Sequence, residues 1–302
     1  MMNNESVKLS LTVVILSFNE AKHIGRCIKN IQEVAERIIL VDSYSTDDTV
    51  EIASSLGAEI YQNPFTHQAQ QIQWALDNID IQTDWVMRMD ADEYILPELA
   101  KELKIKIPVL PDTISGLLIK LRVIFLDKWI KRGFYPMILL RIWRNGAAYI
   151  QQKWMDEHTI LKYGHTMMLE HDMVDHNLNH LGWWTEKHNR YSLREATERL
   201  NLEYGFLGDQ YDTAYKIGNK KKWYKSLYMR LPLFVRPFLY FLYRYIIRLG
   251  FLEGKPGLIW HVLQGFWFQF LVDAKIYQIR HIARKTGKSV KEVLTDDFGV
   301  KL

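Results

Sequence analysis

Three acidic side chains stand directly after an apolar stretch of the chain. The segment "DWVMRMDADE" runs from Trp85 to Met89 as an apolar strand and then carries Asp90, Asp92 and Glu93. Carboxylates this close repel one another, so a cation must offset the repulsion unless the segment lies fully in water. A turn lets Asp90 and Asp92 face one divalent ion, and Mg²⁺ and Mn²⁺ bind few protein oxygens together with phosphate oxygens. The pattern predicts a site for a metal-bound diphosphate, with a solvated loop as the alternative.

Alternating strand and helix patterns in the first hundred residues predict the sheet that positions these acids. One helical stretch has Cys27 on its apolar side, and a second begins at the cap-like Ser45 and Thr46 and stops at Gly57. Between the helical stretches lie short apolar runs, which read "LTVVILSFN", "RIILVDS", "AEIYQNP" and "DWVMRMD". Such alternation is typical of an α/β fold with a mainly parallel sheet flanked by helices.

Polar residues stand at the ends of three of these predicted strands. Ser17, Asn19 and Glu20 follow the first strand, Asp42 the second, and the acidic triplet the fourth. Parallel sheets bind their ligands outside the carboxyl ends of the strands. We therefore expect these side chains to converge on one site.

Three ordered motifs give the chain a resemblance to a known enzyme family. The segments "TVVILSFNEAKHIGRCIKNI", "IILVDSYSTDDTVEIA" and "DWVMRMDADE" resemble inverting glycosyltransferases of family 2, which have the GT-A nucleotide-sugar fold. The resemblance covers residues 9–200 and is nearest to the branch that builds lipopolysaccharide cores and other bacterial surface glycans. The later segments "RGFYPMILLRIWR" and "KHNRYSLREA" also have counterparts in that branch.

The resemblance assigns roles to individual positions. It implies a metal site, for Mn²⁺ or Mg²⁺, at Asp90 and Asp92. It also implies a nucleotide pocket formed by Leu16, Ser17, Phe18, Asn19, Glu20, Asp42, Asp90 and Ala91. The alternative interpretation of Asp42, Asn19 and Glu20 is that they are turn and helix-capping residues, and Phe18 would equally suit a core.

A general base for the transfer is implied in the second half of the chain. Inverting transfer is a single displacement, in which a base removes the proton of the acceptor hydroxyl. The related branch has a His-Glu pair where this chain reads Met155-Asp156-Glu157-His158, so Asp156 replaces the histidine. We assign the base to Glu157, with Asp156 as its competitor and a surface turn as the alternative.

Other charged and aromatic residues near this segment have two interpretations each. Arg132 and Arg141 would contact the donor diphosphate or an acceptor phosphate, because arginine forks suit phosphate oxygens; structural ion pairs are the alternative, as they are for Arg144. The spacing of His171, His176 and His180, without a nearby cysteine, does not suit zinc. The pair Trp183-Trp184 fits core packing better than sugar stacking.

Composition sets broad limits on the class of protein. The chain has 302 residues, a formal net charge of +4, 48% hydrophobic residues and a single cysteine, which excludes an intrachain disulfide. The N-terminal apolar run is read as a buried strand and not as a signal peptide. We predict a catalytic domain over residues 1–212, with a nucleotide-sugar half (1–110) and an acceptor half (111–212), and a helical extension over 213–302.

The predicted extension is basic and aromatic. Between Lys216 and Lys255 the only acid is Glu253. The stretch "LPLFVRPFLYFLYRYIIRLG" has the length of a transmembrane helix, but its three arginines are costly in a bilayer. Their helical spacing predicts a helix lying in the membrane interface, with Arg236, Arg244 and Arg248 facing lipid phosphates. Packing on the catalytic domain or in a homo-oligomer is the alternative, and nucleic acid is excluded as a partner.

These patterns together predict a function. We expect a metal-dependent inverting glycosyltransferase, peripheral to the cytoplasmic face of a bacterial inner membrane. Its partners would be a nucleotide sugar, with UDP the favoured carrier, and a lipid-linked or lipopolysaccharide-type glycan acceptor. The alternatives are a sugar-phosphate nucleotidyltransferase, whose Gly-rich loop is replaced here by "SFNEAKHIG", and a non-catalytic membrane-associated scaffold with a transferase-like domain.

Overall fold

The computed structural model describes residues 8–153, 157–206, 228 and 230–300. The chain forms two compact units, and the predicted boundary at residue 212 lies outside the described residues. The first unit contains Met1–Trp129, Tyr135–Gln151 and Glu157–Leu178, and the second contains Ile130–Phe134, Gln152–Asp156 and Asn179–Leu302. The short stretch Ile130–Phe134 thus belongs to the second unit although both of its neighbours in the chain belong to the first.

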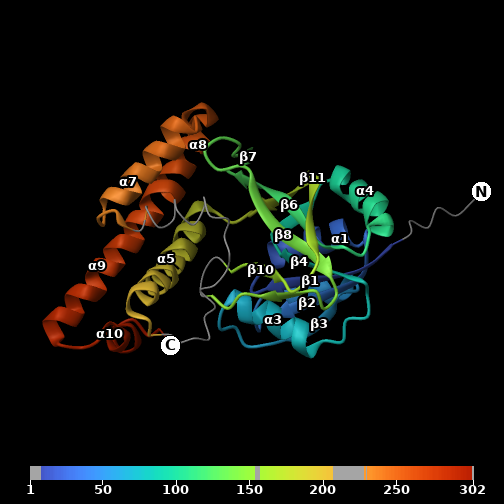
Figure 1. The fold of residues 1–302 in the computed structure, drawn as a ribbon, viewed down its shortest axis with the longest axis horizontal. Coiled ribbons are helices and arrows are strands. Elements are labelled where there is room, and N and C mark those ends of the chain that lie inside the picture. The colour runs from blue at the N-terminus through green and yellow to red at the C-terminus, as the bar shows by residue number, and fades with distance from the viewer. Residues whose placement is uncertain (1–7, 154–156, 207–227, 229, 301–302) are drawn as a thin grey trace, which may run out of the picture. The chain divides into compact units, whose positions relative to one another are not determined.

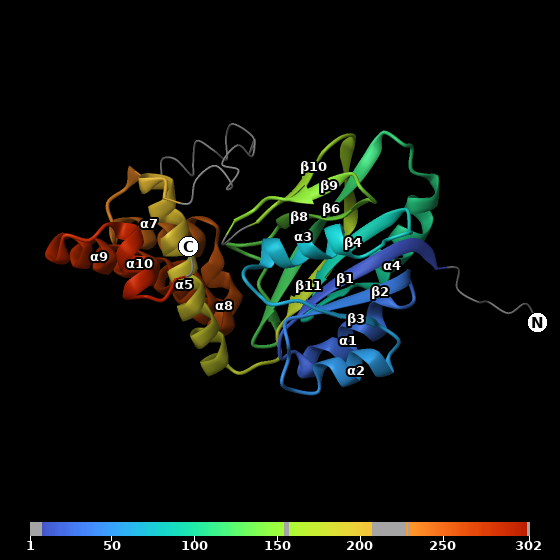
Figure 2. The same ribbon diagram turned by 90° about the horizontal axis from the view of Figure 1, so that it is seen from below.

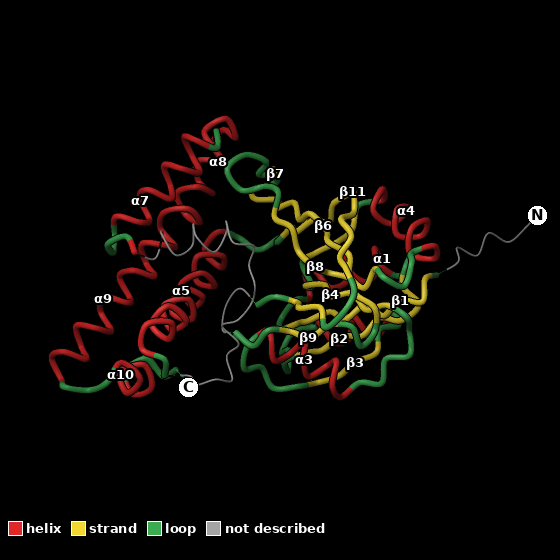
Figure 3. The backbone as a smooth tube through the Cα atoms, viewed as in Figure 1, coloured by secondary structure: helices red, strands yellow, loops and turns green. Residues whose placement is uncertain are grey.

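The first unit begins with strict alternation of strands and helices and continues mainly with strands (Figures 1 and 3). In chain order its elements are β1 (Leu9–Ser17), α1 (Ala21–Ile31), β2 (Ala35–Asp42), α2 (Thr49–Ser55), β3 (Glu59–Gln62), α3 (Gln68–Asn78), β4 (Trp85–Asp90), β5 (Glu93–Ile95), α4 (Pro97–Lys106), a 3₁₀ turn (Ile107–Val109), β6 (Ile114–Phe125), β7 (Lys128–Trp129), β8 (Met137–Arg144), β9 (Ala148–Ile150), β10 (Thr159–Leu161) and β11 (His165–His176).

Nine of these strands form one sheet in the order β3-β2-β1-β4-β8-β6-β11-β5, with β7 paired to β6. The strands β3, β2, β1 and β4 are all parallel, and β11 is parallel to β6. The pairs β4–β8, β6–β8 and β11–β5 are antiparallel. The predicted α/β class, a mainly parallel sheet flanked by helices with a C-terminal helical extension, is confirmed.

Both faces of the central strands are buried, which explains their continuous apolar runs. Alternate residues of β1 point to opposite faces: Val13 and Ile15 pack with α1, and Val14 packs with α3. Figure 2 shows α1 and α2 on one face of the sheet and α3 on the other. Cys27 is fully buried in the core on the α1 side, as predicted, and burial raises the pKa of its thiol.

The start of α2 differs from the prediction. Ser45 and Thr46 do not cap this helix, which begins at Thr49 after Asp48. The hydroxyl and backbone N–H of Ser45 instead donate to Asp42, and the backbone N–H of Thr46 donates to Asn19. Hydrogen bonds to Asp42, three residues earlier, and to Asn19, after β1, therefore replace the helix cap that the sequence suggested.

Helices account for nearly all regular structure in the second unit. They are α5 (Leu181–Tyr204), α7 (Val235–Leu242), a π-helical stretch (Tyr243–Ile247), a 3₁₀ turn (Gly250–Glu253), α8 (Gly254–Trp260), a second π-helical stretch (His261–Trp267), α9 (Phe268–Thr286) and α10 (Val290–Asp296). The core of this unit lies between α5, α9 and α10, where Leu200, Val272 and Leu294 are buried together. A capping box of Ser289 and Glu292 fixes the start of α10.

Two of the three arginines of the predicted interfacial helix, Arg236 and Arg244, are buried inside the second unit. Arg236 and Arg244 are 3% and 2% exposed, and of the three only Arg248 is exposed. Arg236 forms a bidentate ion pair with Asp273 of α9, and Arg244 donates to the carbonyl of Gly133 and lies over the ring of Phe134. The prediction that all three face lipid phosphates was wrong, because Asp273 and a carbonyl acceptor draw two of them inward. Within the described residues, no helix combines the length and the hydropathy needed to cross a bilayer.

One carboxylate ties α4 to β11 and sets a pH dependence. Glu102 is buried and accepts hydrogen bonds from the backbone N–H groups of Glu170 and His171 and from Lys106. Burial raises the pKa of Glu102, but these donors outweigh it and lower the pKa to about 2. A carboxylate with a depressed pKa stabilises the fold above its unfolded pKa and loses that contribution as the pH falls through its folded value.

We therefore predict that Glu102→Gln lowers the free energy of unfolding by about 2 kcal/mol at pH 7, because charge-assisted hydrogen bonds are lost. The difference from the wild type should shrink as the pH falls from about 4.5 to about 2, as measured by urea unfolding. Glu98→Gln, at an exposed position on the same helix, is the control and should change neither quantity. A difference that persists at pH 2 would contradict this account.

Candidate functional site

The carboxyl ends of β1, β2 and β4 bring the predicted polar residues to one edge of the sheet. Ser17 is paired with Asp42 across β1 and β2, and Leu16 is paired with Asp90 across β1 and β4. The predicted convergence of three strand ends is therefore present in the strand register. Leu16 packs against the α3-side core.

Asp42 organises the loop that follows β2. Its carboxylate is fully buried and accepts from the Ser17 hydroxyl at 2.8 Å, the Ser45 hydroxyl at 2.5 Å and the Ser45 N–H at 2.7 Å. These three donors account for both carboxylate oxygens, so the described contacts of Asp42 are structural. The role that the resemblance implies for Asp42, a bond to the base or ribose of the nucleotide, stays a prediction.

The loop after β1 is tied to the same segment. Asn19 adopts a left-handed backbone conformation, with φ 55°, and its side-chain oxygen accepts from the N–H of Thr46 at 2.8 Å. Its own N–H donates to Ser45. Phe18, beside it, is 56% exposed and is not a core residue. Glu20 contacts His23, with 2.5 Å between Oε2 and Nδ1. Hydrogen bonds therefore join the loops at residues 18–20 and 43–46 into one surface, which we call the braced wall. The exposed ring of Phe18 lies on this surface.

The acidic turn after β4 is compensated by two buried arginines. The carboxylate of Asp90 lies 3.8 Å from Arg88 and 3.7 Å from Arg141, and it accepts from the side-chain amide of Gln68 at 3.0 Å. Ala91 is buried beneath the turn. Arg141 was predicted as a phosphate contact, whereas Arg88 and Gln68 were not predicted at all. A cationic residue in the middle of an otherwise apolar strand was the signal that could have revealed Arg88.

Glu93 is held at the base of the turn. It accepts from Arg141 at 2.5 Å and from the N–H of Asp90 at 2.9 Å, and it is 2% exposed. Burial raises the pKa of Glu93 well above its usual value, and Arg141 opposes that effect. The third acid of the triplet is therefore an internal brace that fixes the backbone of Asp90.

Asp92 is oriented by residues from the end of β11. Its carboxylate accepts from the side-chain amide of Asn177 at 2.9 Å. Its carbonyl accepts from the backbone N–H of His176 and from Arg26, which also binds the carbonyl of His176. Asp92 and Asp90 thus have separate supports on opposite sides of Ala91, and the supports at Asn177 and Arg26 were not foreseen.

Glu157 joins this edge through an ion pair that the sequence did not reveal. Its carboxylate lies 2.5 Å from the guanidinium of Arg88, and both side chains are almost fully buried. Arg88 therefore links the predicted base to Asp90. The competing residue, Asp156, lies outside the described residues.

Two further arginines have partners of their own, and the predicted phosphate contact of Arg132 stays a prediction. Arg132 belongs to the second unit, where its N–H donates to Glu253 at 2.9 Å and its guanidinium lies 3.7 Å from the same carboxylate. Arg144 binds the carbonyl of Ile114 and covers the ring of Trp85, at the opposite end of β4 from the acidic turn. The alternative of a structural arginine therefore holds for Arg144.

A metal site at the acidic turn would rest on two carboxylates. Within the described ranges, no group of three or more His, Cys, Asp or Glu side chains is arranged to hold a metal ion. Asp90 and Asp92 supply hard oxygen atoms from one turn, and the side chain of Asp90 is 28% exposed, which leaves it accessible. This donor set fits Mg²⁺ or Mn²⁺, which complete their shell with phosphate oxygens and water.

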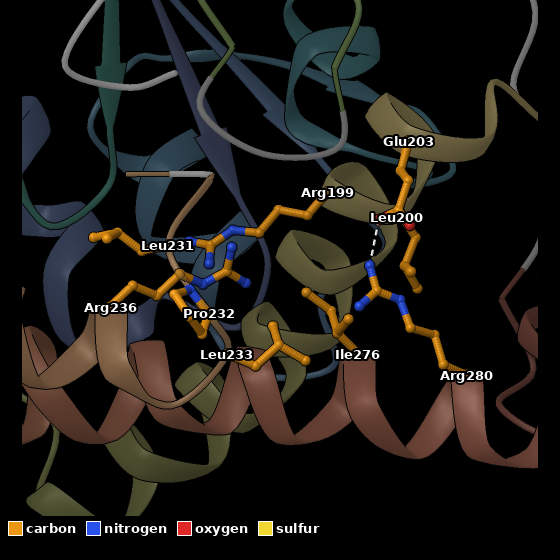
Figure 4. Close-up of a pocket in the computed structure, with 9 residues that line it drawn as sticks. All are labelled: Arg199, Leu200, Glu203, Leu231, Pro232, Leu233, Arg236, Ile276 and Arg280. Carbon is orange, nitrogen blue, oxygen red and sulfur yellow. Dashed lines mark hydrogen bonds and ion pairs between the residues drawn. The ribbon is translucent and has the colours of Figure 1, made fainter. Parts of the chain in front are cut away.

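A separate cavity of about 210 Å³ lies in the second unit (Figure 4). Arg199, Arg236 and Arg280 line it together with apolar side chains. Each arginine has its own carboxylate, namely Glu195, Asp273 and Glu203 respectively. The ion pairs balance the charge of the cavity, so it does not attract an anion as three unpaired arginines would.

Comparison with known proteins identifies the first unit. Residues 12–178, more than half of the chain, match the family model described as "Glycosyl transferase family 2". The chain belongs to this family. A relative, the lipopolysaccharide core biosynthesis glycosyltransferase LpsC of Rhizobium meliloti, is 27% identical over 302 residues, which covers 95% of this chain and 98% of that protein.

Other similarities are partial. An uncharacterized glycosyltransferase of Rickettsia conorii is 35% identical over 101 residues, covering 33% of this chain and 35% of that protein. The matched part thus spans about a third of that relative's length. A solved structure, mannosyl-3-phosphoglycerate synthase from Rubrobacter xylanophilus, is 24% identical with a TM-score of 0.32 and covers 40% of this chain and 42% of that one. That overlap is too small to carry a functional argument.

The buried pair of Arg141 and Glu93 should dominate local stability. We predict that Arg141→Met lowers the free energy of unfolding by about 3–5 kcal/mol, because it leaves buried carboxylates without their cation. Arg37→Met breaks a more exposed arginine–glutamate pair with Glu59 and should cost about 0–1 kcal/mol. Urea unfolding of the two variants measures the contrast.

The double variant Arg141→Met/Glu93→Leu separates pairing from packing. It should recover much of the loss, since an apolar pair replaces an uncompensated charge. Equal losses for Arg141→Met and Arg37→Met would show that burial of the pair has no energetic consequence.

Proposed function

We propose that this chain moves a sugar from a nucleotide diphosphate donor to a glycan acceptor by single displacement with inversion. The observation that carries the proposal is the ion-paired chain of Glu157, Arg88 and Asp90 at the edge where β1, β2 and β4 end. It brings a candidate base beside the predicted diphosphate site. Membership of the family supports the transfer of a sugar.

The nucleotide is proposed to lie against the braced wall made by the loops after β1 and β2. Phe18 offers an exposed ring there, while Ser17, Asn19 and Asp42 hold the wall rigid. A rigid wall lowers the entropy lost when a ligand binds. The carrier that we favour is uridine diphosphate, as the family resemblance implies.

The diphosphate is proposed to lie over the acidic turn, where Asp90 and Asp92 would hold Mn²⁺ or Mg²⁺. A divalent ion bound there would neutralise the diphosphate and so make it a better leaving group. Gln68 and Asn177 fix the two carboxylates through hydrogen bonds of 3.0 and 2.9 Å, which orients them before any ligand arrives.

Glu157 is proposed as the general base. It would take the proton of the acceptor hydroxyl while the new bond to the anomeric carbon forms and the bond to the diphosphate breaks. Arg88 holds Glu157 by an ion pair, with 2.5 Å between its guanidinium and the carboxylate. Arg88 is therefore proposed as a positioning residue.

The acceptor is proposed to be a lipid-linked or lipopolysaccharide-type glycan. The near full-length similarity to the protein named LpsC, a lipopolysaccharide core biosynthesis glycosyltransferase, supports this class. An enzyme that joins a water-soluble donor to a lipid-linked acceptor gains by lying on the membrane. We therefore propose a peripheral location at the cytoplasmic face of the inner membrane.

Substitution of the base tests the mechanism. We predict that Glu157→Gln lowers kcat about 10²- to 10⁴-fold, because proton removal is lost. The thermal shift caused by nucleotide diphosphate should be unchanged, which would show that the donor site is intact. Asp156→Asn is the matched comparison and should retain most of the turnover; the reverse result for the two variants would transfer the role of base to Asp156.

The metal site is tested with binding and hydrolysis together. We predict that UDP raises the melting temperature more with Mn²⁺ than without, and that Asp92→Asn abolishes the extra shift and the metal-dependent donor hydrolysis. Asp112→Asn is the control, since Asp112 is fully exposed and pairs with Arg144 at the opposite end of β4. An extra shift that survives in Asp92→Asn would remove this residue from the metal site.

A further inference from the structure

The helical stretch from Val235 to Ile247 exposes its apolar side. The residues at helical spacing that face solvent are Val235, Phe238, Leu239, Tyr243, Ile246 and Ile247. Arg236 and Arg244 of the same stretch are buried, and Phe241 and Tyr245 contact Phe266 and His261 of the second π-helical stretch. An ordinary surface helix turns its apolar residues toward the core, whereas this stretch exposes six of them as well. The exposed apolar side therefore needs an explanation other than packing within the unit.

The apolar surface continues beyond the end of this helical stretch. Leu249 has a left-handed backbone, with φ 58°, which turns the chain sharply into the 3₁₀ turn. Leu249, Phe251 and Leu252 are all exposed there. A run of exposed apolar residues this long is well beyond the scattered single residues that a soluble surface normally carries. We call the exposed apolar residues between Val235 and Leu252 the apolar stripe.

The charges around the apolar stripe have one sign. Between residues 230 and 272 the sequence contains a single acid, Glu253, and this residue is buried against Arg132. The exposed charged residues of the same span are Arg230, Arg248 and Lys255, which are all cationic. An apolar surface whose own segment exposes only cationic charges matches the interface of an anionic bilayer, where apolar groups enter the acyl boundary and cations meet phosphates.

The same charges disfavour a second copy of the chain as the occupant. In a symmetric dimer the same surface meets itself, so the basic borders would repel each other. We propose that the apolar stripe docks this protein onto an anionic lipid bilayer, with Arg248 and Lys255 beside the headgroup phosphates. Docking would serve the proposed function, because it would hold the enzyme near a lipid-linked acceptor. This inference rests on the proposed function only in taking the acceptor to be lipid-linked.

This docking differs from the one that the sequence suggested. Arginine side chains do not make the main contact, since Arg236 and Arg244 are satisfied inside the second unit. Insertion of apolar side chains supplies the affinity, and the few exposed cations supply the preference for anionic lipid. Binding should therefore survive at high salt more than a purely electrostatic contact would.

Vesicle cosedimentation tests the inference with the full-length protein. We expect binding to vesicles of phosphatidylcholine with phosphatidylglycerol, and weaker binding to phosphatidylcholine alone. Ile247→Asp should lower the partition coefficient by about tenfold or more, because an apolar anchor becomes an anion. Arg248→Gln should lower it by about fivefold on anionic vesicles, as expected for one interfacial cation.

The matched control is Ile105→Asp on α4 of the first unit. Ile105 is 71% exposed and Ile247 is 69% exposed, so the two substitutions make the same chemical change at equally exposed sites. Ile105→Asp should bind vesicles as the wild type does, and both variants should keep the wild-type melting temperature. Equal loss of binding in both variants would overturn the assignment to the apolar stripe.

Two further measurements distinguish the possible failures. Donor hydrolysis without vesicles reports on the proposed function alone. If the protein hydrolyses the donor but does not bind vesicles, only the docking inference is wrong. If it binds vesicles but does not hydrolyse the donor, only the proposed function is wrong. Size-exclusion chromatography with light scattering identifies the competing occupant. If the wild-type protein is a dimer that does not bind vesicles, and Ile247→Asp is a monomer, then the apolar stripe binds a second copy of the chain and not a bilayer.

Discussion

Arg88 and Arg141 each reach from a buried strand to two carboxylates, and the acidic turn after β4 would otherwise be a cluster of like charges. Arg88 serves Asp90 and Glu157, and Arg141 serves Asp90 and Glu93. Two like charges 4 Å apart near a protein surface repel by about 4 kcal/mol. The two guanidinium groups remove that cost, and their rigid forks fix the turn.

This compensation also limits what the turn can bind unaided. The two arginines are shared among three carboxylates, Asp90, Glu93 and Glu157, which leaves no surplus positive charge for a diphosphate that brings at least two more negative charges. Under the proposed function, a donor of that charge would need a cation of its own. Asp92, whose carboxylate accepts from an amide and not from an arginine, is the carboxylate proposed to bind it.

Local patterns in the sequence predicted the alternating strands and helices of the first hundred residues and the converging strand ends, because these depend on hydrophobic periodicity and on the rule for parallel sheets. Pairs that join distant parts of the chain were not predictable in the same way. Arg88 and Glu157 are 69 residues apart, and Arg236 and Asp273 are 37 apart. Helical spacing correctly grouped Arg236 with Arg244 but could not say whether that side faced a partner or solvent, since the answer lay in Asp273 on another helix.

The stretch Ile130–Phe134 belongs to the second unit although the chain before and after it belongs to the first, so the two units are not consecutive segments of the chain. It leaves the first unit after β7, is held in the second by Glu253 and Arg244, and returns before β8, the strand that carries Arg141. Ending the chain after Leu178 would therefore remove Glu253 and Arg244, which hold this stretch, and would leave the ring of Phe134 without its contacts to Arg244 and Trp260. A shortened chain that keeps only the first unit would therefore also need a redesigned connection between β7 and β8.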